Sequence, residues 1–404
     1  MRLILSTVVM VVLADGPLAR AADVPAARNA ALQYWVAFDC LPRGKMTDEE
    51  NRLILEWHKA PFTPENIKIL ESWQSSLKYL HRGAELDDCV WPTAINTPRD
   101  GVGVLMPQQH ARMLAVIGVL RARYRLEQGR PEAGFADVLA VMKLARHVAA
   151  DGGIIALIIG EAIEMMATRC VAGSLWAVKD PDVLRIFLHR WDRLPKAPTT
   201  VAVLTAERDK TIAWLKTCGV DAGSDTEPDL AGNPPPRDRA DRMASKKYLL
   251  GLQTAAGWVR ECTTALDREF SQAIEIAKLP QDEIGAAETE WKKRAEKALA
   301  HTDETMRGFI GLGLPPVYNL RLREARSDTV RAMLRAAVAA KADGKDIAEA
   351  SKDPYSDGPF QVTKTETGFE LRSKLNALIP EGKERANLGP IPAVLSVRTV
   401  RATP

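Results

Sequence analysis

The stretch IIALIIGEAIEMMAT, residues 154–168, decides the fold of this chain. It is apolar on nearly every side of a helix and carries only two charges, Glu161 and Glu164. A helix of this kind lies at the centre of a bundle, with other helices packed around it. Its uncharged run is much shorter than the roughly 18 apolar residues that a membrane helix needs. The sequence therefore predicts an all-α protein built around this segment.

The residues before this stretch predict a helical hairpin. Apolar side chains recur at helical spacing in two segments, on either side of the turn signal Gln128-Gly129-Arg130-Pro131. Two helices joined by so short a turn pack antiparallel. The hairpin is similar to one tetratricopeptide unit, but no second copy follows at that motif's period of about 34 residues. We therefore predict antiparallel helical hairpins stacked as a bundle or as an irregular, tetratricopeptide-like α-solenoid.

The start of the chain has the three-part pattern of a secretory signal. Arg2 supplies the positive charge, residues 3–13 form an uncharged run, and Ala19 and Ala21 stand where a signal peptidase reads. We predict that residues 1–21 are a signal peptide and that the mature protein is secreted or periplasmic. An uncleaved anchor is the alternative. No transmembrane segment is expected once the signal has been removed.

Composition divides the remaining chain into four parts. We expect an N-terminal helical lobe over residues 22–218 and a C-terminal helical lobe over residues 242–345. Residues 219–241 are rich in proline, glycine and aspartate, which is typical of a flexible linker. Residues 346–404 are expected to form a small β-hairpin and a tail, because apolar residues alternate there on both sides of Glu366-Thr367-Gly368.

The charge balance excludes several classes of partner. The chain has 55 Lys plus Arg against 52 Asp plus Glu, with no polybasic block and no acidic tail. Binding to nucleic acid or to an anionic membrane therefore has no electrostatic support. The sequence also lacks the H-E-x-x-H and C-x-x-C signatures of common metal sites and the G-x-S-x-G motif of serine hydrolases. We expect no metal and no cofactor.

The five cysteines can form at most two disulfides if the protein is exported to an oxidising compartment. We predict that Cys40 pairs with Cys89 and that Cys218 pairs with Cys262, because each pair links neighbouring segments. Cys170 follows the apolar helix and is expected to stay a free, buried thiol. The alternative is that the other cysteines are buried thiols as well.

Glu161 and Glu164 form the first candidate site. Their spacing of three residues puts both carboxylates on one side of the apolar helix. A buried pair of this kind can raise one pKa and create a general acid, or can hold a metal together with His147. The interpretation that we favour is a structural salt bridge, with Arg146 and Arg169 neutralising the carboxylates.

An acidic loop forms the second candidate site. Asp87 and Asp88 precede Trp91 in a long irregular stretch, residues 84–106, inside a helical protein. Two carboxylates beside an aromatic ring can grip a sugar or a cation. The alternative is a solvated acidic loop held in place by Cys89.

Three stretches are distinctive together: ALQYWVAF at residues 31–38, the sequence from Leu120 to Glu164, and DPYSDGP at residues 353–359. They resemble a family of uncharacterised secreted bacterial proteins that are mostly helical. The last of the three stretches also looks like the C-terminal turn of secretion-system pseudopilins. The resemblance implies a secreted helical protein and brings no activity. The segment after Phe369 departs from the glycine- and aspartate-rich ending of pseudopilins, which weakens an inference of calcium binding.

These observations lead to two functional hypotheses. The first is a binding or scaffold module of the cell envelope whose partner is a protein or peptide, since stacked helical hairpins leave grooves between them. The second is a hydrolase or lyase that acts on envelope or extracellular polysaccharide through acidic residues. The second requires two carboxylates to converge in a cleft lined by tryptophan. The lack of any catalytic motif favours the first.

Overall fold

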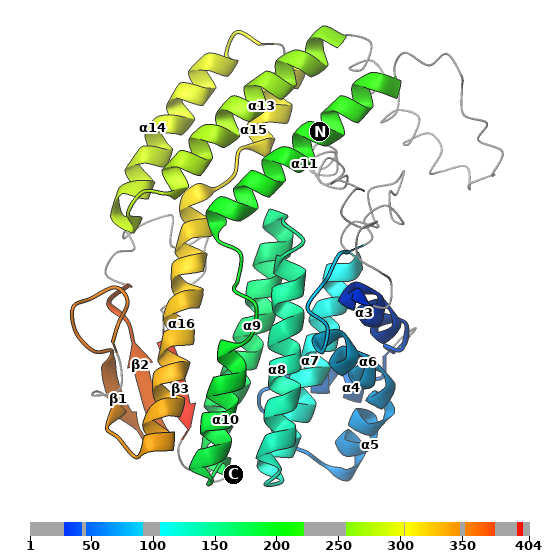
Figure 1. Cartoon of the computed structure of the whole chain (residues 1–404), viewed down its shortest axis with the longest axis vertical. Coiled ribbons are helices and arrows are strands. Elements are labelled where there is room, and N and C mark those ends of the chain that lie inside the picture. The colour runs from blue at the N-terminus through cyan, green and yellow to red at the C-terminus, as the bar shows by residue number, and fades with distance from the viewer. Residues whose placement is uncertain are drawn as a thin grey trace, which may run out of the picture. The chain divides into compact units, whose positions relative to one another are not determined.

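The computed structural model describes residues 28–42, 46–91, 106–221, 256–302, 304–347, 352–375 and 394–398. The described chain is mostly helical with a small antiparallel sheet near its C-terminus, so the predicted fold class is confirmed (Figure 1). It divides into two compact units, which we describe separately: a large unit with residues 23–91, 107–199 and 319–404, and a small unit centred on residues 200–318. The predicted signal peptide lies outside the described residues.

The large unit is built around a long hairpin. Helices α7 (Met106–Glu127) and α8 (Pro131–Ala149) are joined by a tight turn in which Gly129 has a φ of 69°, and α9 (Ile154–Ser174) then packs along α8. The approach of α9 to α8 is close at Gly160, where an added Cβ would lie 2.7 Å from the Ala145 carbonyl oxygen. The predicted hairpin and its apolar third helix are therefore confirmed.

Shorter helices complete this unit, and their first residues explain where they begin. They are α3 (Ala30–Asp39), α4 (Asp48–Leu55), α5 (Pro64–Ser72), α6 (Gln74–Ala84), the 3-10 turn η4 (Leu175–Ala177) and α10 (Pro181–Asp192). Thr47 and Glu50 form a reciprocal capping box at α4. Thr63 and Asp180 each cap a helix whose first residue is proline.

Helix α16 (Val317–Asp343) belongs to the large unit from Asn319 onward. It lies beside α9 and α10, to which it is tied by ion pairs from Arg331 to Glu164 and from Arg335 to Asp192. Figure 1 shows α16 running alongside α9 over much of the length of the unit. This is the arrangement that creates the candidate site.

A three-stranded antiparallel sheet completes the large unit. Its strands are β1 (Gln361–Thr365), β2 (Gly368–Arg372) and β3 (Val394–Arg398), in the order β1-β2-β3. In the predicted hairpin Val362 is opposite Leu371, while β3 lies against both β2 and α9. The preceding DPYSDGP turn is anchored by the buried Asp353, whose carboxylate accepts hydrogen bonds from Ser373 Oγ and from the Lys374 amide, both at 2.8 Å.

The small unit is an all-helical assembly. It contains α11 (Thr200–Asp221), α13 (Ala256–Ala277), α14 (Gln281–Leu299) and α15 (Glu304–Gly313). Its core joins Leu215 of α11 to Leu266 and Phe270 of α13 and to Ile310 of α15. Trp291 of α14 is fully buried and donates its indole hydrogen to Glu269 at 2.9 Å.

The two units divide the chain differently from the expected lobes. Helix α11 groups with α13–α15 instead of the N-terminal helices, and most of α16 groups with the N-terminal helices instead of the C-terminal ones. The helix contacts account for this grouping, because α11 packs on α13 and α16 is ion-paired to α9. Most of the predicted linker, from residue 222 onward, lies outside the described residues.

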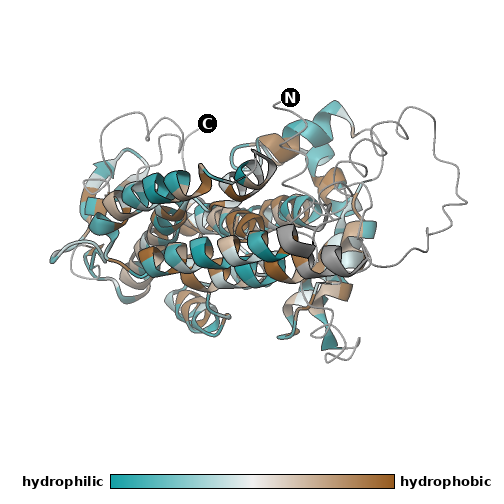
Figure 2. Cartoon of the chain, turned by 90° about the horizontal axis from the view of Figure 1, so that it is seen from above, coloured by the Kyte–Doolittle hydropathy of each residue, from teal (hydrophilic) through white to brown (hydrophobic). Residues whose placement is uncertain are grey.

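The helices carry polar and apolar residues together along their lengths, as Figure 2 shows. Such patterns are typical of helices that pack against one another in water. Among the described residues, no helix has the length and apolar character that crossing a membrane requires.

Candidate functional site

A pocket of about 330 Å³ opens in the large unit. Its walls come from α9, from the residues that follow α10 and from α16. Leu157, Trp191, Leu194 and Pro198 supply apolar surface, and the charged residues of the lining are Arg146, Glu161, Lys196, Glu324, Asp328 and Arg331. We call this space the Glu161 pocket. Apolar walls with a few charged groups are typical of small-ligand sites.

An ion-pair network lies along one side of the Glu161 pocket. Glu164 is buried, and its two carboxylate oxygens accept hydrogen bonds from Arg146 of α8 and, at 2.9 Å, from Arg331 of α16. Arg331 also pairs with Asp328, and these carboxylates raise the pKa of its guanidinium against the opposing effect of burial. The predicted neutralisation of Glu164 by Arg146 is thus observed, and it ties three helices together.

Glu161 behaves differently from Glu164, although it lies only one turn away. It is partly buried at the pocket wall and forms no hydrogen bond or ion pair with the described residues. Burial raises the pKa of its carboxyl to about 7, and the charges of Arg323 and Arg331 oppose this rise without cancelling it. The predicted salt bridge is therefore present for Glu164 and absent for Glu161.

Three arginines of α9 and α16 have no acidic partner among the described residues, and none of the three lines the Glu161 pocket. They are Arg169 of α9 and Arg323 and Arg326 of α16. Burial and the positive charges of Arg169 and Arg323 together lower the pKa of Arg326 to about 10. Arg169 was predicted to neutralise the carboxylates, whereas Arg323 and Arg326 were not identified from the sequence. Their spacing of three residues was the available signal.

The acidic loop does not form the expected sugar or cation site. Trp91 is only 8 % exposed, stacks on Tyr34 with 5.8 Å between ring centroids, and donates its indole hydrogen to the His147 carbonyl at 2.9 Å. Asp87 is paired with Lys143 at 2.6 Å, which lowers the pKa of its carboxyl. The carbonyl of Asp88 accepts a hydrogen bond from the Ala30 amide at 2.8 Å. The loop therefore anchors α3 to α8, and the expectation is corrected because the aromatic ring is inside.

His147 does not join Glu161 and Glu164 as a metal ligand. Its Nδ1 lies 2.9 Å from the Tyr34 hydroxyl, and its ring lies tilted against the Tyr34 ring, which in turn stacks on Trp91. Burial and the charge of Lys143 lower the pKa of His147 to about 4. Within the described part of the chain, no three His, Cys, Asp or Glu side chains are arranged to hold a metal ion.

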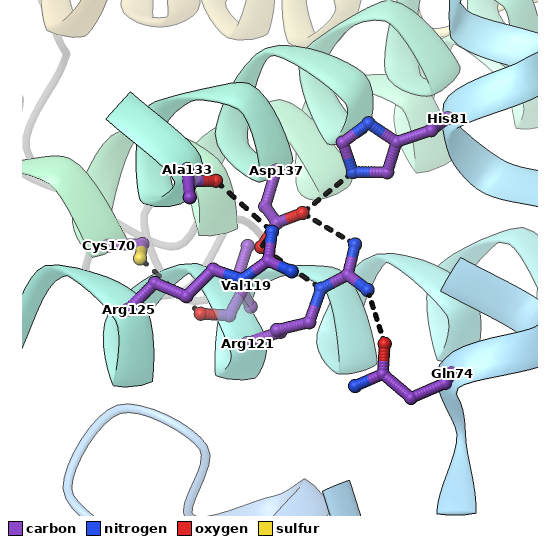
Figure 3. Close-up of polar contacts among 8 residues, drawn as sticks. All are labelled: Gln74, His81, Val119, Arg121, Arg125, Ala133, Asp137 and Cys170. Atoms are coloured by element: carbon purple, nitrogen blue, oxygen red, sulfur yellow. Dashed lines mark hydrogen bonds and ion pairs between the residues drawn. The ribbon is translucent and has the colours of Figure 1, made fainter. Parts of the chain in front are cut away.

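A second buried carboxylate was not identified from the sequence. Asp137 of α8 is fully buried and accepts hydrogen bonds from Arg121 and Arg125 of α7, with His81 of α6 2.7 Å from the same carboxylate (Figure 3). Gln74 of α6 in turn accepts a hydrogen bond from Arg121 at 3.0 Å. The carboxylate is enclosed by its partners, so this Asp137 cluster stabilises the hairpin and leaves no group for a ligand.

The cysteines do not form the predicted Cys40–Cys89 disulfide; both are free thiols. Cys40 follows the last residue of α3, whereas Cys89 lies against Ala31 at the other end of that helix. Nine residues of helix separate these positions by about 14 Å, too far for a disulfide. Cys262 is buried on α13 and the side chain of Cys218 lies outside the described residues, so that pairing stays a prediction. Cys170 is a buried free thiol, as expected.

Comparisons with known proteins add no functional assignment. The chain matches no protein-family model, no curated protein and no solved structure.

Proposed function

We propose that this protein is an exported binding protein of the cell envelope and that its ligand occupies the Glu161 pocket. The observation that carries the proposal is the state of Glu161, a partly buried carboxyl group at the pocket wall without a partner among the described residues. Burying such a group costs stability unless something compensates, so a bound ligand is a natural partner.

The surroundings of Glu161 support a preformed site. Arg146, Glu164 and Arg331 hold three helices together along one side of the pocket, and Trp191 and Leu157 supply rigid apolar surface. A volume of about 330 Å³ fits the lower end of the usual range for small-molecule pockets. The ligand that we propose is therefore a small polar molecule or one terminal group of a larger envelope component.

A hydrolase that uses Glu161 as general acid is the second candidate. A carboxyl with a pKa near 7 is suited to donating a proton at neutral pH. Such a mechanism needs a second carboxylate. The nearby acids Glu164, Asp328 and Glu324 are all ion-paired with arginines, which favours binding over catalysis.

The experiment compares the mature protein, beginning at Ala22, with an Ala197→Trp variant that fills the pocket. Both are dialysed to equilibrium against a low-molecular-mass extract of the producing cell's envelope, and retained compounds are identified by mass spectrometry. We expect a compound that the wild type enriches and Ala197→Trp does not. Ala286→Trp, at an exposed position of α14, is the matched control and should retain the compound.

The same extract distinguishes binding from catalysis. If a trace amount of wild-type protein consumes a compound and Glu161→Gln does not, the hydrolase replaces the binding protein as the function. If wild type and Ala197→Trp retain the same compounds, the pocket is not the binding site. Export is tested separately by N-terminal sequencing of the protein from envelope and culture fractions, where cleavage after Ala21 is expected.

A further inference from the structure

Six charged residues line the Glu161 pocket, and two of them are unpaired. The four that form ion pairs with neighbouring side chains are Arg146, Glu324, Asp328 and Arg331. The other two, Glu161 and Lys196, form no ion pair with any described residue. The pocket wall therefore carries one negative group and one positive group that are both left for a ligand.

The two unpaired groups come from different walls of the pocket. Glu161 belongs to α9, whereas Lys196 lies in the segment that follows α10. They line the same space of about 330 Å³ without pairing with each other. Lys196 is exposed, and its flexible stem lets the ammonium group adjust to the position of a ligand. A small molecule with a positive and a negative group close together is therefore able to contact both.

Much of the remaining lining is apolar. Leu157 of α9, Trp191 of α10 and, from the segment after α10, Leu194 and Pro198 supply this surface. The ring of Trp191 packs against Phe187 with 5.8 Å between ring centroids, which holds it in place. An apolar group of a ligand gains free energy by leaving water for such a wall. The volume of the pocket suits a small molecule better than a long peptide.

We propose that the Glu161 pocket binds a free α-amino acid with an apolar side chain. Its ammonium group would lie on Glu161, its carboxylate on Lys196, and its side chain on the apolar wall of Trp191 and Leu157. This inference rests on the proposed binding function and specifies the class of its ligand. A simple cation would leave Lys196 unmatched and a simple anion would leave Glu161 unmatched, whereas an amino acid satisfies both.

The probe is leucine, compared with two analogues that each lack one charged group. Isoamylamine is leucine without its carboxylate, and isocaproate is leucine without its ammonium group. Calorimetric titration of the mature protein at pH 8 keeps Glu161 ionised, because the pKa of its carboxyl is about 7. We expect saturable binding of leucine, and about tenfold or greater weakening for isocaproate, which cannot use Glu161. Isoamylamine should bind about two- to fivefold more weakly than leucine.

Substitutions assign each charged group of the ligand to its residue. Glu161→Gln should weaken leucine and isoamylamine about tenfold and leave isocaproate unchanged. Lys196→Ala should weaken leucine and isocaproate about two- to fivefold, since the lysine is exposed, and leave isoamylamine unchanged.

Each substitution has a matched control outside the pocket. Glu132→Gln removes the charge of an exposed glutamate of α8, and Lys179→Ala removes an exposed lysine just before α10. Neither should change the affinity for leucine. Circular dichroism spectra and unfolding temperatures of all variants show whether a loss of binding reflects a loss of fold.

The outcomes separate failure of this inference from failure of the proposed function. Phenylalanine is a second probe, because its ring can pack on Trp191. Absence of saturable binding by either leucine or phenylalanine overturns the amino-acid site, as does binding that Glu161→Gln and Lys196→Ala leave unchanged. Binding of isoamylamine or isocaproate as tight as that of leucine also overturns it, yet leaves the pocket as a ligand site. The proposed function itself fails only if Ala197→Trp retains every compound that the wild type retains.

Discussion

The Asp137 cluster and the Glu161 pocket use the same residue types with opposite results. In the cluster one buried carboxylate has Arg121, Arg125 and His81 around it, and every oxygen is occupied (Figure 3). At the pocket wall the Glu161 carboxyl has no partner among the described residues, and burial raises its pKa to about 7. The difference separates charges that hold the fold together from charges that are left for a ligand.

The largest loss of stability is expected when the Asp137 cluster is broken. Asp137→Asn keeps the shape of the side chain but leaves the buried Arg121 and the partly buried Arg125 without their carboxylate. Removing one partner from a buried charge network costs about 3–5 kcal/mol of unfolding free energy. Urea unfolding of wild type and variant measures the loss. A loss below about 1 kcal/mol would show that the cluster is not structural.

The second largest loss of stability is expected from a substitution of Glu164, which is ion-paired and lies one turn from Glu161. Glu164→Gln leaves Arg146 and Arg331 facing each other across α9, although Asp328 still compensates Arg331. We expect a loss of about 2–3 kcal/mol in the same urea experiment, because hydrogen bonds to a charged group are removed. An equal loss for Glu161→Gln would contradict the distinction between the two carboxyls.

Glu161→Gln should change the unfolding free energy less than Glu164→Gln does. At high pH it should raise this free energy instead of lowering it. The pKa of this carboxyl is about 7 in the folded protein, above its usual range, so wild-type stability falls as the pH rises from about 5 to about 7. The variant lacks this penalty. We expect it to be about 1–2 kcal/mol more stable than the wild type at pH 8 and equal to it at pH 5. Unfolding free energies at both pH values, subtracted between the two proteins, provide the measurement.

The smallest effect is expected at the aromatic cluster of the acidic loop. Tyr34→Phe removes the hydroxyl that lies 2.9 Å from His147 Nδ1 and keeps the stacked ring. A loss of about 1 kcal/mol follows if the cluster only anchors α3. Ligand binding by the Glu161 pocket should be unchanged, and impaired binding would mean that the loop takes part in the site after all.

The helices and turns could be predicted from local sequence patterns, because helical periodicity and turn residues depend only on neighbouring positions in the chain. The apolar run around Ile155, the turn at Gly129 and the alternation on both sides of Gly368 all fold as their neighbours in sequence indicate. The pairing of helices is a long-range property. Arg331 reaches Glu164 across 167 residues of chain, and no local pattern indicates that contact.

The same reason limits what the sequence indicated about the site. It identified Glu161 and Glu164 as a pair, but only the packing of α16 distinguishes the carboxyl that is neutralised from the one that is not. For Trp91 the sequence suggested a site residue where the structure has a core residue. Beside Asp87 and Asp88 it looked exposed, whereas Tyr34 and Phe38 of α3 enclose its ring.

The most direct test follows the Glu161 carboxyl itself. Carbon-13 NMR of glutamate-labelled protein, with Glu161→Gln used for assignment, gives its titration curve. We expect a pKa of about 7, because the carboxyl is buried without a partner among the described residues. A carboxyl that titrates near pH 4.5, the ordinary value for glutamate, would contradict the unpaired, buried state of Glu161.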